Sequence, residues 1–175
     1  MAAVRSGRHR GDHGAAAVEF ALVTPLLVVI LFGIIDYGIW FADSISARQA
    51  VRDAARSGAT EQFGASCGTG GDLEALACTV KSTMGQISGT TAVRIELAPS
   101  PTAASGITWA QGATLRVCAA TQHQTLMPLV PFPNNGVSVT RVDMPIESAT
   151  AANLAVRIPY LVDADPSGSG WSWCP

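Results

Sequence analysis

The most distinctive part of this sequence is the apolar stretch AAAVEFALVTPLLVVILFGIIDYGIW, residues Ala15–Trp40. Within it, Phe20–Ile35 carries no charged residue. A helix rises about 1.5 Å per residue, so about 20 apolar residues are enough to cross the hydrocarbon core of a bilayer. The stretch therefore predicts a transmembrane helix at 15–41. It is longer than the apolar core of a cleavable secretory signal, which has about 7–15 residues, and no clear A-x-A cleavage site follows it.

A basic tail precedes this stretch and predicts its orientation. The tail MAAVRSGRHRGDHG, residues 1–14, contains Arg5, Arg8 and Arg10. Because basic residues beside a span stay on the cytoplasmic side, we expect a cytoplasmic N-terminus and an extracytoplasmic remainder. Three arginines beyond the span argue the other way, but they carry less weight because aspartates are interleaved with them in a helical pattern: Arg48, Arg52 and Arg56, with Asp43 and Asp53.

Two residues inside the apolar stretch are unusual for a membrane span. Glu19 is a carboxylate, which costs about 2.5–3.5 kcal/mol at the centre of a span and by default marks a functional position. Alternatively, Glu19 lies near enough to the cytoplasmic end to extend into the headgroups. Pro25 removes a backbone donor and leaves the carbonyl of Ala21 without its helical partner, unless Thr24 or a neighbouring helix supplies one. The simpler interpretation of Pro25 is a tolerated kink.

The helix is expected to continue outside the membrane. Phe41–Gly58 is rich in alanine, arginine and glutamine, lacks proline, and ends on a glycine in a plausible C-cap position. The result is one helix of about 40 residues, of which 42–60 form the outer continuation. Helical spacing places Asp43 and Asp53 on one side of this helix. The other side, which we expect to pack on the domain, carries Phe41, Ile45, Ala50, Ala54 and the stem of Arg48.

The remainder, 61–175, predicts a small α+β domain with one short helix and an antiparallel sheet. Asp72 is a candidate N-cap, and apolar residues follow at helical spacing until Gly85: Leu73, Leu76, Ala77, Val80 and Met84. Apolar and polar residues alternate in three later segments: Val93–Leu97, Leu115–Ala119 and Val137–Ile146. In the third, Val137 and Val139 are out of phase with Val142, Met144 and Ile146, which predicts a β-bulge or two short strands.

Two further segments connect or follow these strands. Thr125–Pro133 contains three prolines and therefore cannot be a central strand. It is either a loop folded onto the core or an exposed apolar patch for a partner, and Asn134-Asn135-Gly136 predicts a turn after it. The terminal DADPSGSGWSWCP, 163–175, is expected to be flexible, with Trp171 and Trp173 packed on the domain.

All four cysteines, Cys67, Cys78, Cys118 and Cys174, lie outside the predicted span. An even number in an oxidising compartment favours disulfides, and four cysteines allow three connectivities. We favour Cys67–Cys78 and Cys118–Cys174. A zinc site is the alternative, although the sequence lacks the paired C-x-x-C spacing typical of one.

Composition and motifs argue against several other functions. The net charge of −2 provides no basic platform for nucleic acid. The glycine-rich run Cys67–Gly71 lacks the lysine of a P-loop and follows no strand. His9 and His13 lie in the basic tail and His123 stands alone, so the sequence contains no histidine pair for a metal or a triad. We therefore expect neither a cofactor nor an enzyme.

The residues around Glu19 resemble those of a bacterial type IV prepilin-like protein, in which a glycine precedes the cleaved bond and glutamate is the fifth mature residue. Gly14 followed by AAAVEF has this spacing. More narrowly, AAAVEFALVTPLLVVILFGIIDYG and QAVRDAARSGA (Gln49–Ala59) look like the TadE family of tight-adherence (Tad/Flp) pilus proteins. LRVCAATQHQTLMPLVPFPNN and GVSVTRVDMPIES are similar to the C-terminal half of that family, though more loosely.

The resemblance implies a minor pilin or pseudopilin with a pilin-like α+β fold, cut by a prepilin peptidase between Gly14 and Ala15. It also implies that Glu19, Phe20 and Pro25 serve assembly, that Pro25 is a weak point where the helix extends on leaving the lipid, and that the partners are the bilayer, other Tad subunits and the inner-membrane assembly platform. The alternatives are an uncleaved, membrane-anchored extracytoplasmic binding or enzymatic domain, and a secreted disulfide protein.

Overall fold

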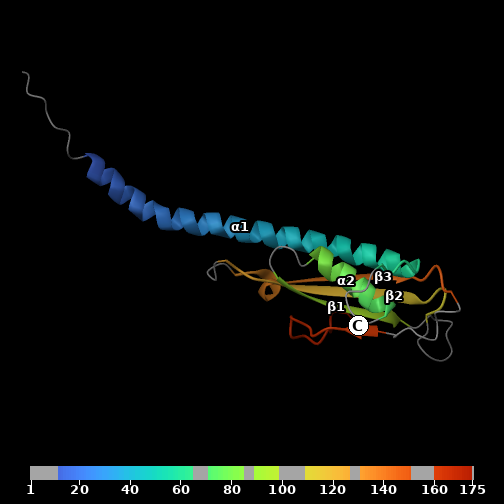
Figure 1. The fold of residues 1–175 in the computed structure, drawn as a ribbon. Helices are drawn as coiled ribbons and strands as arrows, with labels where there is room; N and C mark the ends of the chain where they lie inside the picture. The colour runs from blue at the N-terminus through green and yellow to red at the C-terminus, as the bar shows by residue number, and fades with distance from the viewer. Residues whose placement is uncertain are drawn as a thin grey trace, which may run out of the picture.

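The computed structural model describes residues 12–64, 71–84, 89–98, 109–126, 131–150 and 160–174. Its first element is α1 (Asp12–Ala59), a helix of 48 residues. The N-terminal half of α1 projects away from a small domain that packs along its other half (Figure 1). The prediction of one helix that continues beyond the apolar stretch is therefore confirmed.

The domain consists of one short helix and a four-stranded sheet. The helix is α2 (Asp72–Met84), and the strands are β1 (Gly89–Ala98), β2 (Thr114–His123), β3 (Val137–Pro145) and β4 (Tyr160–Val162). Neighbouring strands are antiparallel and the order is β3-β2-β1-β4. These elements confirm the predicted α+β class. β4 was not predicted from the sequence, because it is only three residues long; it pairs with Arg94–Glu96 of β1.

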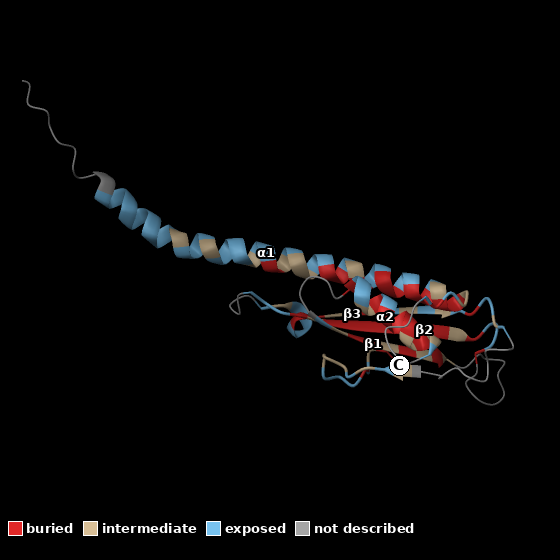
Figure 2. Cartoon of the chain, viewed as in Figure 1, coloured by how far each residue is buried: buried red, intermediate tan, exposed pale blue. Residues whose placement is uncertain are grey.

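The two helices cover one face of the sheet side by side. α1 contacts β2 and β3, whereas α2 contacts β1 and β4. Figure 2 shows the buried residues gathered where the helices meet the sheet, while the projecting half of α1 is exposed. The strands supply to this core a set of side chains that are at most 4 % exposed: Val93, Ile95, Leu97, Leu115, Val117 and Ala119.

The opposite face of the sheet is also partly covered, and this corrects the prediction of a bulge in β3. Val137 is buried in a second cluster with Ala92, Cys118, Ala120, Trp171 and Cys174. β3 and β2 pair residue for residue from Thr114↔Pro145 to Gln122↔Val137. β3 is therefore a regular strand without a bulge. Its apolar residues change phase because Val137 packs in the second cluster, whereas Val142 and Met144 pack against the core under the helices.

The outer half of α1 packs closely on the sheet through small residues, and two details of the prediction are wrong. The buried residues are mostly alanines: Ala47, Ala50, Ala54, Ala55 and Ala59. Phe41 and Ile45, however, are 57 % and 55 % exposed, whereas Asp43 is buried. Gly58 is not a C-cap. It lies inside α1, buried against Leu76 and Leu115, and the left-handed residue after the helix is Glu61, with φ of 60°.

Hydrogen bonds fold the C-terminal segment on itself, and Asp163 and Cys174 join it to the sheet, so the part that is described is not the flexible tail predicted for it. The Asp165 carboxylate accepts hydrogen bonds from the backbone N–H groups of Ser167 and Trp171, both 2.9 Å long, and from the hydroxyls of Ser167 and Ser169. Desolvation opposes ionisation of Asp165, but these hydrogen bonds outweigh it and hold the pKa of the carboxyl well below its usual value. Trp171 is buried, as predicted.

Candidate functional site: the projecting helix and its junction with the domain

The predicted processing site lies in the first turn of α1. Gly14 and Ala15 are both exposed and helical. A Cβ atom added at Gly14 would meet no other atom within 4 Å. A side chain at position 14 is therefore sterically tolerated by the described part of the chain, and any effect of it would report on a second protein.

Glu19 lies one helical turn after Ala15, which places the two residues on the same side of α1. The neighbouring apolar side chains are exposed, with Val18 at 61 % and Phe20 at 73 %. Among the described residues, none forms a hydrogen bond or an ion pair with the Glu19 carboxylate. The Glu19 charge thus lies within the apolar band of α1, defined as residues 15–35, and has no partner in the described part of its own chain.

α1 bends in its N-terminal part, which contains Pro25 (Figure 1). Proline is a recognised cause of such a bend because its ring crowds the preceding turn and it has no N–H. The Thr24 hydroxyl donates a hydrogen bond to the carbonyl of Phe20 at 2.6 Å. One of the sequence-based alternatives required Thr24 to bond to the carbonyl of Ala21, but this hydroxyl bonds to the carbonyl of Phe20 instead.

The apolar band of α1 ends where the loop between β2 and β3 reaches the helix. Asp36 is completely buried, and its Oδ1 accepts a hydrogen bond of 3.1 Å from the backbone N–H of Leu126. The Tyr37 hydroxyl donates a hydrogen bond of 2.8 Å to the carbonyl of Pro131. The ring of Phe132 stacks on Tyr37, with 4.9 Å between centroids.

These contacts show where the described ends of Thr125–Pro133 lie, which differs from a loop folded onto the hydrophobic core. The ends pack on α1 rather than standing free, although Leu126 itself is 63 % exposed. Residues 127–130 lie outside the described part of the chain. The turn that follows is confirmed as η1 (Pro133–Gly136), in which Asn134, Asn135 and Gly136 all have positive φ.

A second carboxylate of α1 is buried beside His123, which the sequence presented as a lone histidine. The Nδ1 atom of His123 lies 3.6 Å from Oδ2 of Asp43, and both side chains are at most 5 % exposed. Asp36 and Asp43 are seven residues apart, which is about two helical turns, so they lie on the same face of α1. This spacing is the feature of the sequence that could have indicated that both face the domain. Among the described residues, no group of three or more potential metal ligands gathers here or elsewhere.

One of the two predicted cysteine pairs is confirmed. Cys118 and Cys174 form a disulfide with a Cα–Cα distance of 6.4 Å. It joins the end of the chain to the face of the sheet that the helices leave open. Cys78 in α2 is also disulfide-bonded, whereas its predicted partner Cys67 lies outside the described residues.

The comparisons with known proteins agree with the predicted resemblance at the projecting helix. No curated protein and no solved structure is significantly similar to the chain. A family model described as TadE-like protein matches residues 14–56, a range that begins at the predicted processing glycine and includes most of α1. α1 is also long and apolar enough to cross a membrane, with a mean hydropathy of 2.6 in its most apolar window. Residues 14–56 thus form a TadE-like segment, which confirms the predicted resemblance of this part of the chain to the TadE family.

Proposed function

We propose that this protein is a minor pilin or pseudopilin that takes part in assembly of a Tad pilus through its N-terminal helix. The observation that carries the proposal is the exposed Glu19 in the apolar part of α1, five residues after Gly14, in a segment that matches the TadE family. In this function the chain is a substrate of a peptidase and a structural subunit, and it is not an enzyme.

Processing is the first step. A prepilin peptidase cleaves the bond between Gly14 and Ala15, releases the basic leader 1–14, and leaves a free ammonium at Ala15. The helix then spans the membrane at 15–41, while 42–60 and the domain 61–175 stay on the extracytoplasmic side. The three arginines of the leader support this orientation.

The free ammonium and Glu19 explain how helices would choose their register. A buried ion that has no partner costs several kcal/mol, and a well-placed opposite charge offsets that cost. We infer that the Ala15 ammonium of one subunit pairs with Glu19 of its neighbour when the helices pack against each other. A shift along the helix separates the pair, so a single register is favoured. The exposed side chains around Glu19 supply the apolar contact surface.

The junction gives the domain a fixed position relative to the helix. Asp36 and Tyr37 bind the β2–β3 loop where the apolar band ends, and Asp43 contacts His123 one to two turns further on. A subunit drawn from the membrane platform into a fibre by its helix would therefore carry its domain in a defined orientation. The partners in this function are the peptidase, the other Tad subunits, the inner-membrane platform and the bilayer.

The test combines two substitutions with the mature N-terminus. Gly14→Val is expected to leave the unprocessed chain in the membrane of cells that contain the peptidase, whereas the wild-type chain begins at Ala15 by intact-mass spectrometry. Glu19→Ala is expected to be inserted and cleaved normally, yet to lose crosslinking to pilus subunits. Arg56→Gln, at an exposed position of α1 far from Glu19 and outside the apolar stretch, is the control and should crosslink like wild type.

Two results would overturn the proposal. A wild-type chain that keeps residues 1–14 in its native cells would favour an uncleaved membrane anchor. Wild-type crosslinking and piliation by Glu19→Ala would leave this carboxylate without a function in assembly, as expected if it merely extends into the cytoplasmic headgroups.

A further inference from the structure

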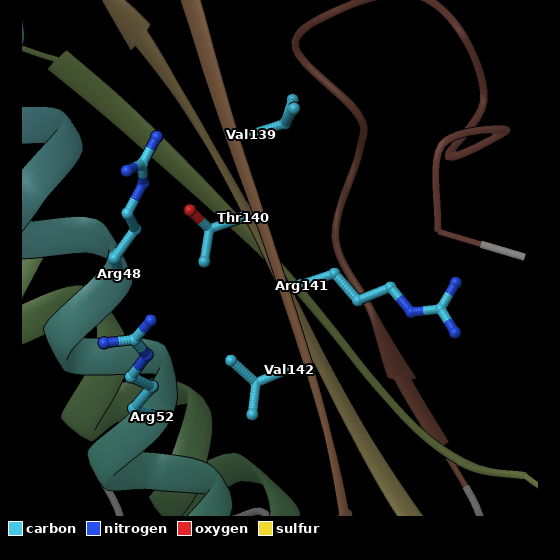
Figure 3. A pocket seen from close by; sticks show the side chains of 6 residues that line it. All are labelled: Arg48, Arg52, Val139, Thr140, Arg141 and Val142. Carbon is cyan, nitrogen blue, oxygen red and sulfur yellow. The ribbon is translucent and has the colours of Figure 1, made fainter.

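The strand at one end of the sheet has an outer edge that pairs with no other described strand, and two arginines of α1 lie beside it. β3 is the terminal strand in the order β3-β2-β1-β4. Arg48 and Arg52 are exposed, and with Val139–Val142 they line a cavity of about 310 Å³. In Figure 3, Thr140 and Val142 lie on the side of β3 that faces these arginines, and Arg141 points to the opposite side.

The outer edge of β3 presents backbone groups that a further strand could bind. Ile146 donates its N–H to the carbonyl of Ala113, and backbone groups alternate in direction along an antiparallel strand. Even-numbered residues therefore bond to β2, and Val139, Arg141 and Asp143 turn their N–H and C=O groups outward. Within the described part of the chain, no other segment forms backbone hydrogen bonds with this edge.

The spacing of the arginines matches that of alternate residues on an added strand. Arg48 and Arg52 are four residues apart on a helix, which is about 6 Å along its axis. Side chains on one face of a strand repeat every two residues, or about 6.8 Å. Neither arginine forms an ion pair with a described residue. Arg141, by contrast, is paired with Asp143 on the other side of the strand.

We propose that the β3 edge binds an extended acidic segment of another protein as a fifth strand, with carboxylates at alternate positions facing Arg48 and Arg52. Strand addition of this kind derives affinity from main-chain hydrogen bonds and specificity from alternate side chains. The proposal concerns a surface distant from Gly14 and Glu19, so it does not depend on the assembly function proposed above.

The charges argue against a second copy of this chain as the occupant. Antiparallel pairing of β3 with another β3 would bring together Arg48 and Arg52 of both copies, which form no ion pair with any described residue. The opposite edge, β4, is followed by Asp163 and Asp165, but both carboxylates are already engaged. Asp163 accepts the N–H of Val93 and pairs with Lys81, and Asp165 binds the residues that follow it.

The position of this cavity, hereafter the groove between α1 and β3, argues against lipid phosphates as the ligands of Arg48 and Arg52. Arg48 lies twelve residues beyond Asp36, where the apolar band ends, which corresponds to about 18 Å of helix. The polar headgroup layer adds only about 5–8 Å to each side of the hydrocarbon core. The groove therefore stands clear of the membrane surface, at a height where the domain of another protein can reach it.

The test uses the full chain in detergent micelles with its disulfides intact. The probe is a fluorescent ten-residue peptide that alternates aspartate with valine, and its binding is followed by anisotropy. The double variant Arg48→Gln/Arg52→Gln is expected to bind it at least tenfold more weakly than wild type. The matched control is Arg56→Gln, an exposed arginine one turn further along α1 that does not line the groove. It should bind like wild type.

Two altered peptides and one cysteine variant complete the test. A peptide that alternates lysine with valine, and an acidic peptide methylated on alternate backbone nitrogens, are both expected to bind at least tenfold more weakly than the probe. Equal binding by either peptide, or unchanged binding by the double variant, would overturn the proposal. So would a Val139→Cys protein whose copies crosslink to each other through that cysteine, because the edge would then be occupied by a second copy.

Discussion

Gly58→Ala is expected to destabilise the outer domain, against the usual preference of helices for alanine. In an exposed helix interior, this change would stabilise by about 1 kcal/mol. Here the added Cβ would lie 2.8 Å from Cδ1 of Leu76 and closer still to Cδ2 of Leu115. Both leucines are completely buried, so they have little room to move away. Overpacking of a dense core costs about 1–3 kcal/mol.

Subtracting the alanine preference leaves a net loss of about 0–2 kcal/mol. The assay is urea unfolding in detergent micelles, followed by the fluorescence of the buried Trp109 and Trp171. Gly38→Ala is the matched control in the same helix, because a Cβ there would meet nothing within 4 Å. It should not lower stability. A second variant, Gly58→Val, should lose more than Gly58→Ala. If both variants at position 58 were as stable as wild type, the close approach of α1 to the sheet would be refuted.

Three other predictions concern the edges of the domain. Replacing Cys118 and Cys174 by alanine should lower stability by about 2–4 kcal/mol, measured by urea unfolding, because their bond closes a long loop; an unchanged midpoint would contradict this. The pKa of Asp165 is depressed in the folded state, so its contribution to stability is present above the unfolded pKa of about 3.9 and is lost as the pH falls below it. Asp165→Asn should therefore be less stable than wild type at neutral pH, and its stability should change less between neutral and acidic pH, as followed by Trp171 fluorescence. Identical stability–pH profiles for the two proteins would show that this carboxylate does not contribute to acid unfolding. Phe132→Ala should speed hydrogen exchange at Leu126 and around Tyr37 without changing exchange in β1, because the loop loses its ring contacts with α1; uniform exchange changes would argue against a local junction.

Two kinds of contact would meet in one subunit if both proposals hold. The projecting half of α1 would select neighbouring helices through Glu19, and the β3 edge would select an acidic strand at the height of the domain. The junction at Asp36, Tyr37 and Phe132 lies between these surfaces and connects them mechanically. A variant that loosens the junction is therefore expected to affect the relative position of the two surfaces without altering either one.

Local patterns predicted the elements that are defined by residues close together in the chain. The bounds of α2 follow from Asp72 and the helical repeat up to Met84, and the alternation in 93–97 and 115–119 marks the centres of β1 and β2. The apolar run from Ala15, with Gly14 and Glu19 at their spacing, identified the TadE-like segment. Such features could be predicted because periodicity, length and motif spacing act within one element.

Which surfaces meet could not be predicted from local patterns, because the contacts join residues far apart in the chain. Composition favoured Phe41 and Ile45 as the packing face of α1, yet the domain covers Asp36 and Asp43 because Leu126 and His123 approach from the β2–β3 region. β4 forms because the edge of β1 provides backbone partners for three residues, Tyr160–Val162, that lie more than 60 positions later in the sequence. Val137 is buried because the Cys118–Cys174 bond brings Trp171 to the second face of the sheet. The long apolar helix and most strand positions could be predicted from the sequence, since they depend on local periodicity. The buried carboxylates, the close packing at Gly58 and the open β3 edge depend on residues far apart in the chain, and only folding brings those together.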